Sequence, residues 1–126
     1  MAELTYRQAV AAALAQEMAR DDRVVVLGED VASGGVFKTT AGLLAEFGKE
    51  RVWDTPISEQ AILGVAMGAA MTGMRPVAEM QFADFIANAF NQLTNNAATS
   101  AYRAGGTPAA RRAASEPTST SRLLGA

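Results

Sequence analysis

The residues best able to do chemistry in this sequence are carboxylates, because the chain contains neither histidine nor cysteine. The absence of histidine removes the commonest general base and the commonest metal ligand, and with them Ser–His–Asp hydrolysis and the usual zinc chemistry. The absence of cysteine excludes disulfides and thiolate metal sites. Any catalysis would therefore depend on carboxylates or on a bound cofactor.

Glu59 is the carboxylate in the most informative position. Pro56 restricts the residue before it to an extended conformation, and Ser58 suits a helix N-cap, so Glu59 falls at the first helical position. The following residues 61–71 carry no charge, and a helix that is apolar all round is predicted to be buried. Glu59 therefore lies where a polar loop meets a buried helix. It either compensates the helix dipole or takes part in catalysis.

Glu29 and Asp30 form a second candidate pair. They follow the run Val24–Leu27 and Gly28. A short run of branched apolar residues without alternation is typical of a parallel strand buried on both faces. Because open α/β sheets bind ligands outside the carboxyl ends of their strands, the pair is a candidate for binding. The alternative is that both are solvated loop acids.

The elements that must position these carboxylates alternate between helices and strands. We predict helices over 6–20, 41–47, 59–71 and 82–103, and strands over 24–27, 51–54 and 75–80. Thr5 and Gln8 have the form of a capping box, and Thr39 or Thr40 is the expected cap of the second helix. In the last helix we expect buried side chains at Phe85, Phe90 and Leu93. This alternation predicts an α/β domain with a parallel sheet.

Length and composition limit the classes of protein and partner. The 126 residues are enough for one domain, or for part of a larger protein, and 49% hydrophobic residues can build a core. The net charge of −2 gives no case for nucleic acid or an anionic membrane as partner. We see no signal peptide, and the apolar run is shorter than the roughly 20 residues that span a bilayer. We expect a cytoplasmic protein, or one of an organelle matrix.

Two further features concern packing and the C-terminal end. Gly64 and Gly68 are four residues apart, which allows close approach of another helix. No Walker loop or Gly-x-Gly-x-x-Gly motif is present, so no phosphate-binding loop is predicted.

Residues 107–126 contain no aromatic and no β-branched apolar residue. Their composition predicts a disordered, low-complexity tail.

Several sequence blocks have a familiar form. They include Leu27-Gly-Glu-Asp-Val31, Asp54-Thr-Pro-Ile-Ser-Glu59, Arg75-Pro-Val-Ala-Glu79 and Gln81-Phe-Ala-Asp-Phe85. These blocks resemble the beta subunit of the decarboxylating component of 2-oxo acid dehydrogenase complexes. The likeness is closest to the pyruvate and acetoin type, with the branched-chain type a near relative, and it runs from about residue 3 to residue 106. The resemblance implies a transketolase-like, thiamine-diphosphate-binding fold of the pyrimidine type.

The resemblance also implies roles for four residues. Glu59 matches the glutamate that hydrogen-bonds N1′ of the cofactor's aminopyrimidine and so assists removal of the thiazolium C2 proton. Phe85 matches the aromatic residue that packs on the aminopyrimidine ring, and Ile57 lies beside that ring. Glu29 matches an acidic residue near the cofactor, in a water-lined passage between paired active sites. The implied reaction is oxidative decarboxylation of pyruvate or a related 2-oxo acid, with acyl transfer to lipoyl.

The implied partners explain why no phosphate-binding loop is found. In this family the diphosphate and its Mg²⁺ are held by an alpha subunit in an alpha2-beta2 assembly, and a lipoyl acyltransferase is the next component. Residues 1–106 would be the N-terminal part of the pyrimidine-type domain. We interpret 107–126 as frameshifted, because codons for this stretch can be read in a shifted phase as the family's continuation.

We expect the chain alone to be inactive. One alternative is another transketolase-like thiamine enzyme, such as a transketolase or a deoxyxylulose-phosphate synthase. The other is a non-catalytic fragment that competes for the alpha subunit.

Overall fold

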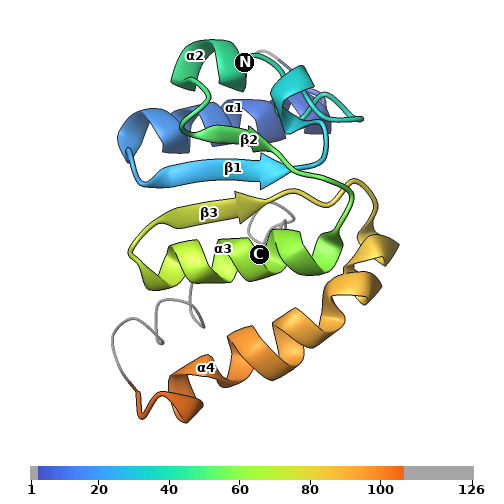
Figure 1. The fold of residues 1–126 in the computed structure, drawn as a ribbon. Helices are drawn as coiled ribbons and strands as arrows, with labels where there is room; N and C mark the ends of the chain where they lie inside the picture. The colour runs from blue at the N-terminus through green and yellow to red at the C-terminus, as the bar shows by residue number, and fades with distance from the viewer. Residues whose placement is uncertain (1–2, 107–126) are drawn as a thin grey trace.

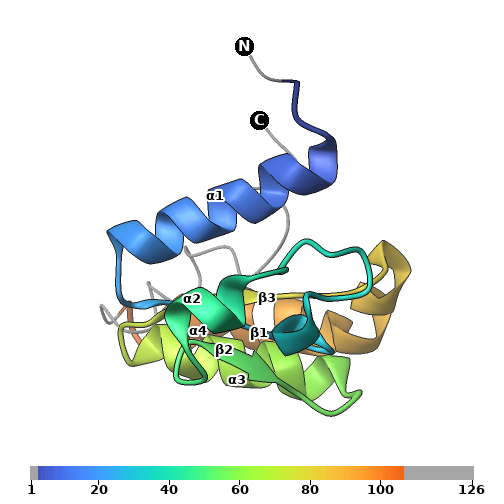
Figure 2. The same cartoon turned by 90° about the horizontal axis from the view of Figure 1, so that it is seen from above.

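The structure, a computed structural model, describes residues 3–106 and arranges them in three layers, helix on sheet on helix (Figures 1 and 2). The helical elements are α1 (Tyr6–Arg20), a 3₁₀ turn (Val31–Ser33), α2 (Leu43–Phe47), α3 (Glu59–Met71), a 3₁₀ segment (Ala83–Ala89), a π segment (Gln92–Ala97) and α4 (Ala98–Arg103). The strands are β1 (Val24–Gly28), β2 (Val52–Asp54) and β3 (Arg75–Ala78). The tail predicted over 107–126 lies outside the described residues.

The sheet confirms the predicted fold class. Its strand order is β2-β1-β3, and both pairings are parallel. Val26 of β1 lies opposite Val52 on one side and Val77 on the other. Every residue of the central strand is buried, as its unbroken apolar sequence predicts. The carboxyl ends of all three strands therefore lie at one edge of the sheet.

Each face of the sheet carries its own core. Successive strand residues point to opposite faces, so Val26 and Leu27 belong to different cores. On one face α1 packs over the β1–β2 side through Val10, Leu14 and Met18. On the other face α3 packs through Ile62, Leu63 and Ala66. Figure 2 shows α1 and α3 on opposite sides of the strands.

The first helix has the predicted bounds and the predicted cap. The Thr5 hydroxyl accepts a hydrogen bond from the Gln8 backbone N–H, and the Gln8 side chain accepts one from the Thr5 backbone. This reciprocal arrangement satisfies two backbone donors at the helix start.

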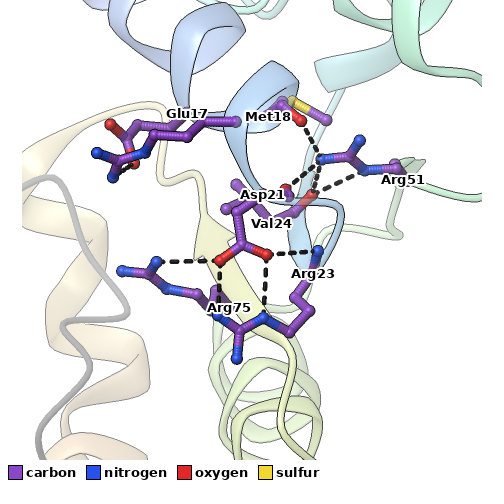
Figure 3. Close-up of polar contacts among 8 residues, drawn as sticks. Glu17, Met18, Asp21, Arg23, Val24, Arg51 and Arg75 are labelled. Atoms are coloured by element: carbon purple, nitrogen blue, oxygen red, sulfur yellow. Dashed lines mark hydrogen bonds and ion pairs between the residues drawn. The ribbon is translucent and has the colours of Figure 1, made fainter.

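Arg51 ties the end of α1 to the start of β1, at the edge opposite the strand carboxyl ends (Figure 3). Its guanidinium donates to the backbone carbonyls of Met18 at 2.8 Å, Asp21 at 2.9 Å and Val24 at 2.8 Å. A planar guanidinium suits this task because it directs several N–H donors at once. One side chain thus satisfies three carbonyls at a chain reversal.

Asp21 forms the charged part of the same junction (Figure 3). Its carboxylate accepts hydrogen bonds from Arg23 at 2.7 Å and Arg75 at 3.2 Å. These bonds, the one from the Arg23 side chain first, hold the pKa of Asp21 well below its usual range.

The second helix is shorter than predicted, and the predicted cap is wrong. It begins at Leu43 because Gly42 has a φ of 87°, which lies outside the helical region. Thr40 is buried and does not cap the helix, since its hydroxyl donates to the Val31 carbonyl at 2.8 Å. The Thr40 hydroxyl, which the local sequence predicts to cap the helix, is therefore used in a contact with the preceding turn.

The third helix has the predicted bounds, but it is not buried all round within residues 3–106. Ile62, Leu63 and Ala66 are buried, whereas Val65 is 52% exposed and Met71 37% exposed. Ser58 occupies the N-cap position but its side chain makes no capping hydrogen bond. Part of the apolar surface of α3 therefore stays uncovered by the described residues.

The last helical region follows the predicted path with three different hydrogen-bond patterns. The Thr94 and Thr99 hydroxyls donate to the backbone carbonyls of Phe90 and Asn95, which competes with a regular α-helical ladder. Phe90 is 60% exposed, so its predicted burial is wrong. Phe85 and Leu93 are half-buried. Within 3–106 no helix is long and apolar enough to cross a membrane.

Candidate functional site

The predicted carboxylates gather at the carboxyl edge of the sheet. Glu29 follows β1, and the turn before Glu59 begins where β2 ends. The Asp54 carboxylate accepts a hydrogen bond from the Ala32 backbone N–H at 2.8 Å. The Thr55 N–H donates to the Gly28 carbonyl at 2.9 Å. These two bonds hold the start of α3 against the end of β1.

This arrangement brings Glu29 and Glu59 together although they are 30 positions apart in the chain. Both are half-buried. The pKa of Glu29 is raised, first by burial and then by the negative charges of Glu59 and Asp30. A carboxyl group of this kind holds a proton more readily than a solvated one. Glu29 is therefore suited to sharing a proton with a bound molecule.

Asp30 differs from its neighbour. It is exposed and has a φ of 56°, and its backbone carbonyl accepts from the N–H groups of Ser33 and Gly35. Asp30 therefore builds the turn after β1, and its charge acts on Glu29 from the solvent side.

The predicted ring-contacting residues offer apolar surface. Ile57 is 82% exposed, although a large aliphatic side chain is normally buried. Phe85 is half-buried and meets Phe82 edge-to-face, with ring centroids 5.3 Å apart. The centroid of the Phe82 ring also lies 5.4 Å from that of the Phe37 ring. The roles that the resemblance gives to Ile57 and Phe85 stay predictions.

Glu79 is a site residue that sequence reasoning missed. It directly follows β3, so the rule that selected Glu29 could have selected it too. Burial, together with the charges of Glu29 and Asp30, raises the pKa of Glu79 to about 7. Its Oε2 atom is buried and has no hydrogen-bond partner among residues 3–106.

Gly28 makes room for Glu79. A Cβ atom at Gly28 would lie 2.8 Å from the Glu79 carbonyl oxygen and 2.9 Å from its Cβ. Both distances are too short for non-bonded atoms, so only glycine fits at the end of β1. The three acidic residues Glu29, Glu59 and Glu79 thus share one edge of the sheet.

A cavity of about 570 Å³ lies on the α1 face, with Glu79 in its wall. None of Glu29, Ile57, Glu59 and Phe85 lines it, so this cavity and the predicted cofactor site are distinct. Over residues 3–106, no group of three His, Cys, Asp or Glu side chains is placed to hold a metal ion.

The fold and this site belong to a known class. The family model for the pyrimidine binding domain of transketolase matches residues 2–108, and the chain belongs to that family. Among its relatives, the 2-oxoisovalerate dehydrogenase subunit beta of Bacillus subtilis (strain 168) is 60% identical over 104 residues. The pyruvate dehydrogenase E1 component subunit beta of Staphylococcus epidermidis (strain ATCC 12228) is 48% identical over 108 residues. The predicted resemblance to such beta subunits is confirmed.

The chain matches only part of each relative. The alignment covers 82% of this chain but 32% of the Bacillus subtilis protein. For the Staphylococcus epidermidis protein the shares are 85% and 33%. A mitochondrial 2-oxoisovalerate dehydrogenase subunit beta from Chaetomium thermophilum, 53% identical over 98 residues, is matched over 21% of its length. The chain thus spans a third or less of these relatives.

Proposed function

We propose that this chain is the N-terminal part of a beta subunit of a 2-oxo acid dehydrogenase, and that it carries the aminopyrimidine half of a thiamine diphosphate site. The observation that carries this proposal is the position of Glu59 at the first turn of α3, beside Glu29 at the carboxyl edge of the sheet. The strong likeness to two kinds of beta subunit supports the same reaction class.

The residues that the resemblance assigns to the cofactor have side chains of types that suit an aminopyrimidine. Glu59 offers a carboxyl group to a ring nitrogen, and Ile57 offers an exposed aliphatic surface. Phe85 offers an aromatic face of the kind on which a heteroaromatic ring stacks. The Thr55 hydroxyl oxygen is buried and has no partner among residues 3–106, so it too could meet a polar group of a ligand.

When bound, thiamine diphosphate supplies the nucleophile and the electron sink for decarboxylation. The residues of this chain would orient the aminopyrimidine ring of the cofactor and hold a proton at it. The Glu59 carboxyl would hold a proton at N1′ of the aminopyrimidine. The charge of Glu59 helps to raise the pKa of the neighbouring Glu29, so Glu29 holds a proton more readily than a solvated carboxyl does. Ile57 and Phe85 would fix the plane of the ring.

The remaining parts of the site belong to partners. An alpha subunit would hold the diphosphate and Mg²⁺ in an alpha2-beta2 assembly, and a lipoyl acyltransferase would receive the acyl group. Pyruvate or a related 2-oxo acid is the substrate. Residues 1–106 are the N-terminal part of the domain, and the chain alone has no turnover.

A chimera tests this function. Residues 1–106 would replace the matched region of the Bacillus subtilis relative, and the product would be assembled with its alpha subunit, thiamine diphosphate and Mg²⁺. We expect 2-oxo acid-dependent reduction of an artificial electron acceptor. Glu59→Gln should lower kcat by about 10²–10⁴-fold, because it removes the proton-holding group. The matched control is Glu46→Gln on the exposed side of α2, which should change little.

Two results would contradict the proposal. One is a chimera that assembles with the alpha subunit but has no activity while the parent enzyme is active. The other is full activity of the Glu59→Gln chimera. Turnover by the purified 126-residue chain without an alpha subunit would show that its predicted inactivity is wrong.

A second function is a non-catalytic fragment that competes for the alpha subunit. The half-exposed side chains of Val65 and Phe90 favour it, because they leave apolar surface available for a partner. Co-purification of the chain with the alpha subunit, with displacement of the full-length beta subunit and loss of activity, would identify this function.

A further inference from the structure

Three phenylalanines form an aromatic row that ends at the candidate site. The ring of Phe82 contacts those of both Phe37 and Phe85, with centroid distances of 5.4 Å and 5.3 Å. The interplanar angles are 79° and 64°, so both contacts are edge-to-face. Aromatic pairs prefer this geometry because the positive edge of one ring meets the negative face of the other. The row ends at Phe85, the residue for which we propose contact with the aminopyrimidine.

The local backbone brings Phe82 and Phe85 together. The Phe85 N–H donates to the Phe82 carbonyl at 3.1 Å, and the 3₁₀ segment Ala83–Ala89 begins at this turn. A 3₁₀ helix has three residues per turn, so side chains three positions apart lie on the same side of it. The 3₁₀ form of this segment therefore places the ring of Phe82 beside that of Phe85.

The other end of the row belongs to the turn after β1. The Gly35 N–H donates to the carbonyl of Asp30 at 2.8 Å, and Asp30 directly follows Glu29. Gly35 has a φ of 70°, which glycine adopts without steric cost. This turn thus carries Glu29 at its start and Phe37 two residues after Gly35. The aromatic row therefore links the carboxyl edge of the sheet to Phe85.

The row lies at the surface of the described residues rather than in a core. Phe37 is 49% exposed and Phe82 44% exposed, and Phe85 is half-buried. Within residues 3–106 none of the three belongs to either hydrophobic core. A phenylalanine outside a core can occupy more than one staggered rotamer. The contact with Phe82 therefore restrains the ring of Phe85 where no core does so.

The edge-to-face contact also suits a ring that must accept a ligand. One such contact covers at most one face of the Phe85 ring, so Phe82 leaves the other face free for stacking. We propose that Phe82 is a positioning residue that, supported by Phe37, holds Phe85 in the rotamer that stacks on the aminopyrimidine of thiamine diphosphate. A ring held before the ligand arrives lowers the entropic cost of binding. This inference rests on the proposed function, from which it takes the role of Phe85.

NMR of the 126-residue chain tests the restraint without any cofactor. Three-bond couplings to Cγ report the χ1 angle of Phe85. We expect one dominant rotamer in the wild-type chain and in Phe82→Tyr, which keeps the ring, and averaged couplings in Phe82→Leu, which loses it. The matched control is Phe90→Leu, because Phe90 is 60% exposed and is not part of the row. Identical Phe85 couplings in the wild-type and Phe82→Leu chains would overturn the proposal.

Titration of thiamine diphosphate tests the consequence for binding. The chimera of residues 1–106 with the Bacillus subtilis relative is assembled with its alpha subunit and Mg²⁺, and the dissociation constant of the cofactor is measured by calorimetry. Phe82→Leu should raise this constant roughly threefold to tenfold, the effect of losing one aromatic pair. Phe82→Tyr should restore the wild-type value, and Phe90→Leu should not change it.

The turnover number separates positioning from damage to the fold. At saturating cofactor, Phe82→Leu should change kcat by less than about twofold, because Phe82 acts through Phe85 and does not touch the reacting atoms. A kcat that falls as much as the cofactor affinity, in Phe82→Leu and Phe82→Tyr alike, would overturn the proposal.

A double variant shows whether Phe82 acts through Phe85. In a Phe85→Leu chimera, adding Phe82→Leu should change the cofactor dissociation constant by less than about twofold. Equal effects of Phe82→Leu in both backgrounds would overturn the inference, as would weakened binding in Phe85→Leu without weakened binding in Phe82→Leu. Both results leave the proposed function intact. An unchanged dissociation constant in Phe85→Leu would instead overturn the proposed contact of Phe85 with the cofactor, and this inference with it.

Discussion

At the scale of single residues, position decides how three glutamates behave. Glu29 and Glu79 follow neighbouring parallel strands, and Glu59 begins the helix that returns to the same edge. Burial raises the pKa of both Glu29 and Glu79, and each lies within reach of other negative charges. The ionisation state of this edge therefore depends on the whole group of carboxyls.

Glu79→Gln should make the chain more stable at pH 8. The folded pKa of about 7 lies above the ordinary value of 4.5, so the folded chain binds more protons between these values. The stability that the protonated carboxyl contributes is present below pH 4.5 and is lost as the pH rises through 7. Since Glu79 is partly solvated, the gain at pH 8 should be on the order of 1 kcal/mol.

Urea unfolding at pH 5 and pH 8 measures this difference. Glu46→Gln on the exposed surface of α2 is the control and should follow the wild-type chain at both pH values. Equal stability changes for Glu79→Gln at pH 5 and pH 8 would show that ionisation of Glu79 does not oppose folding.

Gly28→Ala should destabilise the chain, whereas Gly68→Ala should not. A Cβ at Gly28 would meet the Glu79 carbonyl oxygen at 2.8 Å, and relief of this overlap costs about 1–3 kcal/mol. At Gly68 nothing lies within 4 Å, and alanine in a helix interior gains about 0.5–1 kcal/mol over glycine. Denaturation midpoints should therefore move in opposite directions for the two variants.

At the scale of elements, two junctions hold the sheet at opposite edges. The hydrogen bonds of Asp54 and Thr55 fix α3 against the carboxyl end of β1. The guanidinium of Arg51 fixes α1 and β2 against its amino end. The first junction positions the candidate site, and the second provides only structural support.

Arg51→Met should destabilise the chain by about 2 kcal/mol, because it removes the guanidinium that donates to three partly buried carbonyls, of which the Asp21 carbonyl keeps a second donor in the Val24 N–H. Arg20→Met is the control. Arg20 makes an exposed ion pair with Glu17, and such pairs contribute about 0–1 kcal/mol. Thermal unfolding of the two variants gives the comparison. Similar losses in both would mean that the Arg51 bonds add little stability.

At the scale of the whole molecule, the described residues expose apolar surface at several places. The outer side of α3, Phe90 and the cavity on the α1 face all carry large side chains that residues 3–106 leave uncovered. The chain matches 32% of the Bacillus subtilis relative and 21% of the Chaetomium thermophilum relative. The exposed surfaces therefore fit the partners proposed above.

The stability of the whole chain should be greatest in mildly acidic solution. The lowered pKa of Asp21 gives stability that is present above its ordinary value of 3.8 and is lost as the pH falls. The raised pKa of Glu79 gives stability that is lost between pH 4.5 and about 7. Chemical denaturation from pH 3 to pH 8 should show a maximum. Asp21→Asn should weaken the loss of stability on the acid side of this maximum, and Glu79→Gln should weaken the loss on the neutral side. A stability that is constant from pH 3 to pH 8 would contradict both expectations.

The sequence predicts the local elements well because their signals are local. The capping pair Thr5 and Gln8, the branched run 24–27 and the position of Glu59 each depend on neighbours within a few residues. The predicted cap of α2 was wrong because the Thr40 hydroxyl donates to the carbonyl of Val31, nine positions earlier in the chain. The predicted burial of Phe90 was wrong because burial depends on which distant elements cover a side chain.

The sequence by itself determined the α/β class, the start of α3 and the family, since apolar periodicity, capping residues and the Asp54–Glu59 block can all be read along the chain. Only the tertiary structure decided that Glu29, Glu59 and Glu79 share one edge and that Glu79 lies half-buried beside a cavity. The reason is that parallel strand pairing joins residues far apart in sequence. Burial and charge–charge repulsion arise only when such residues meet in space.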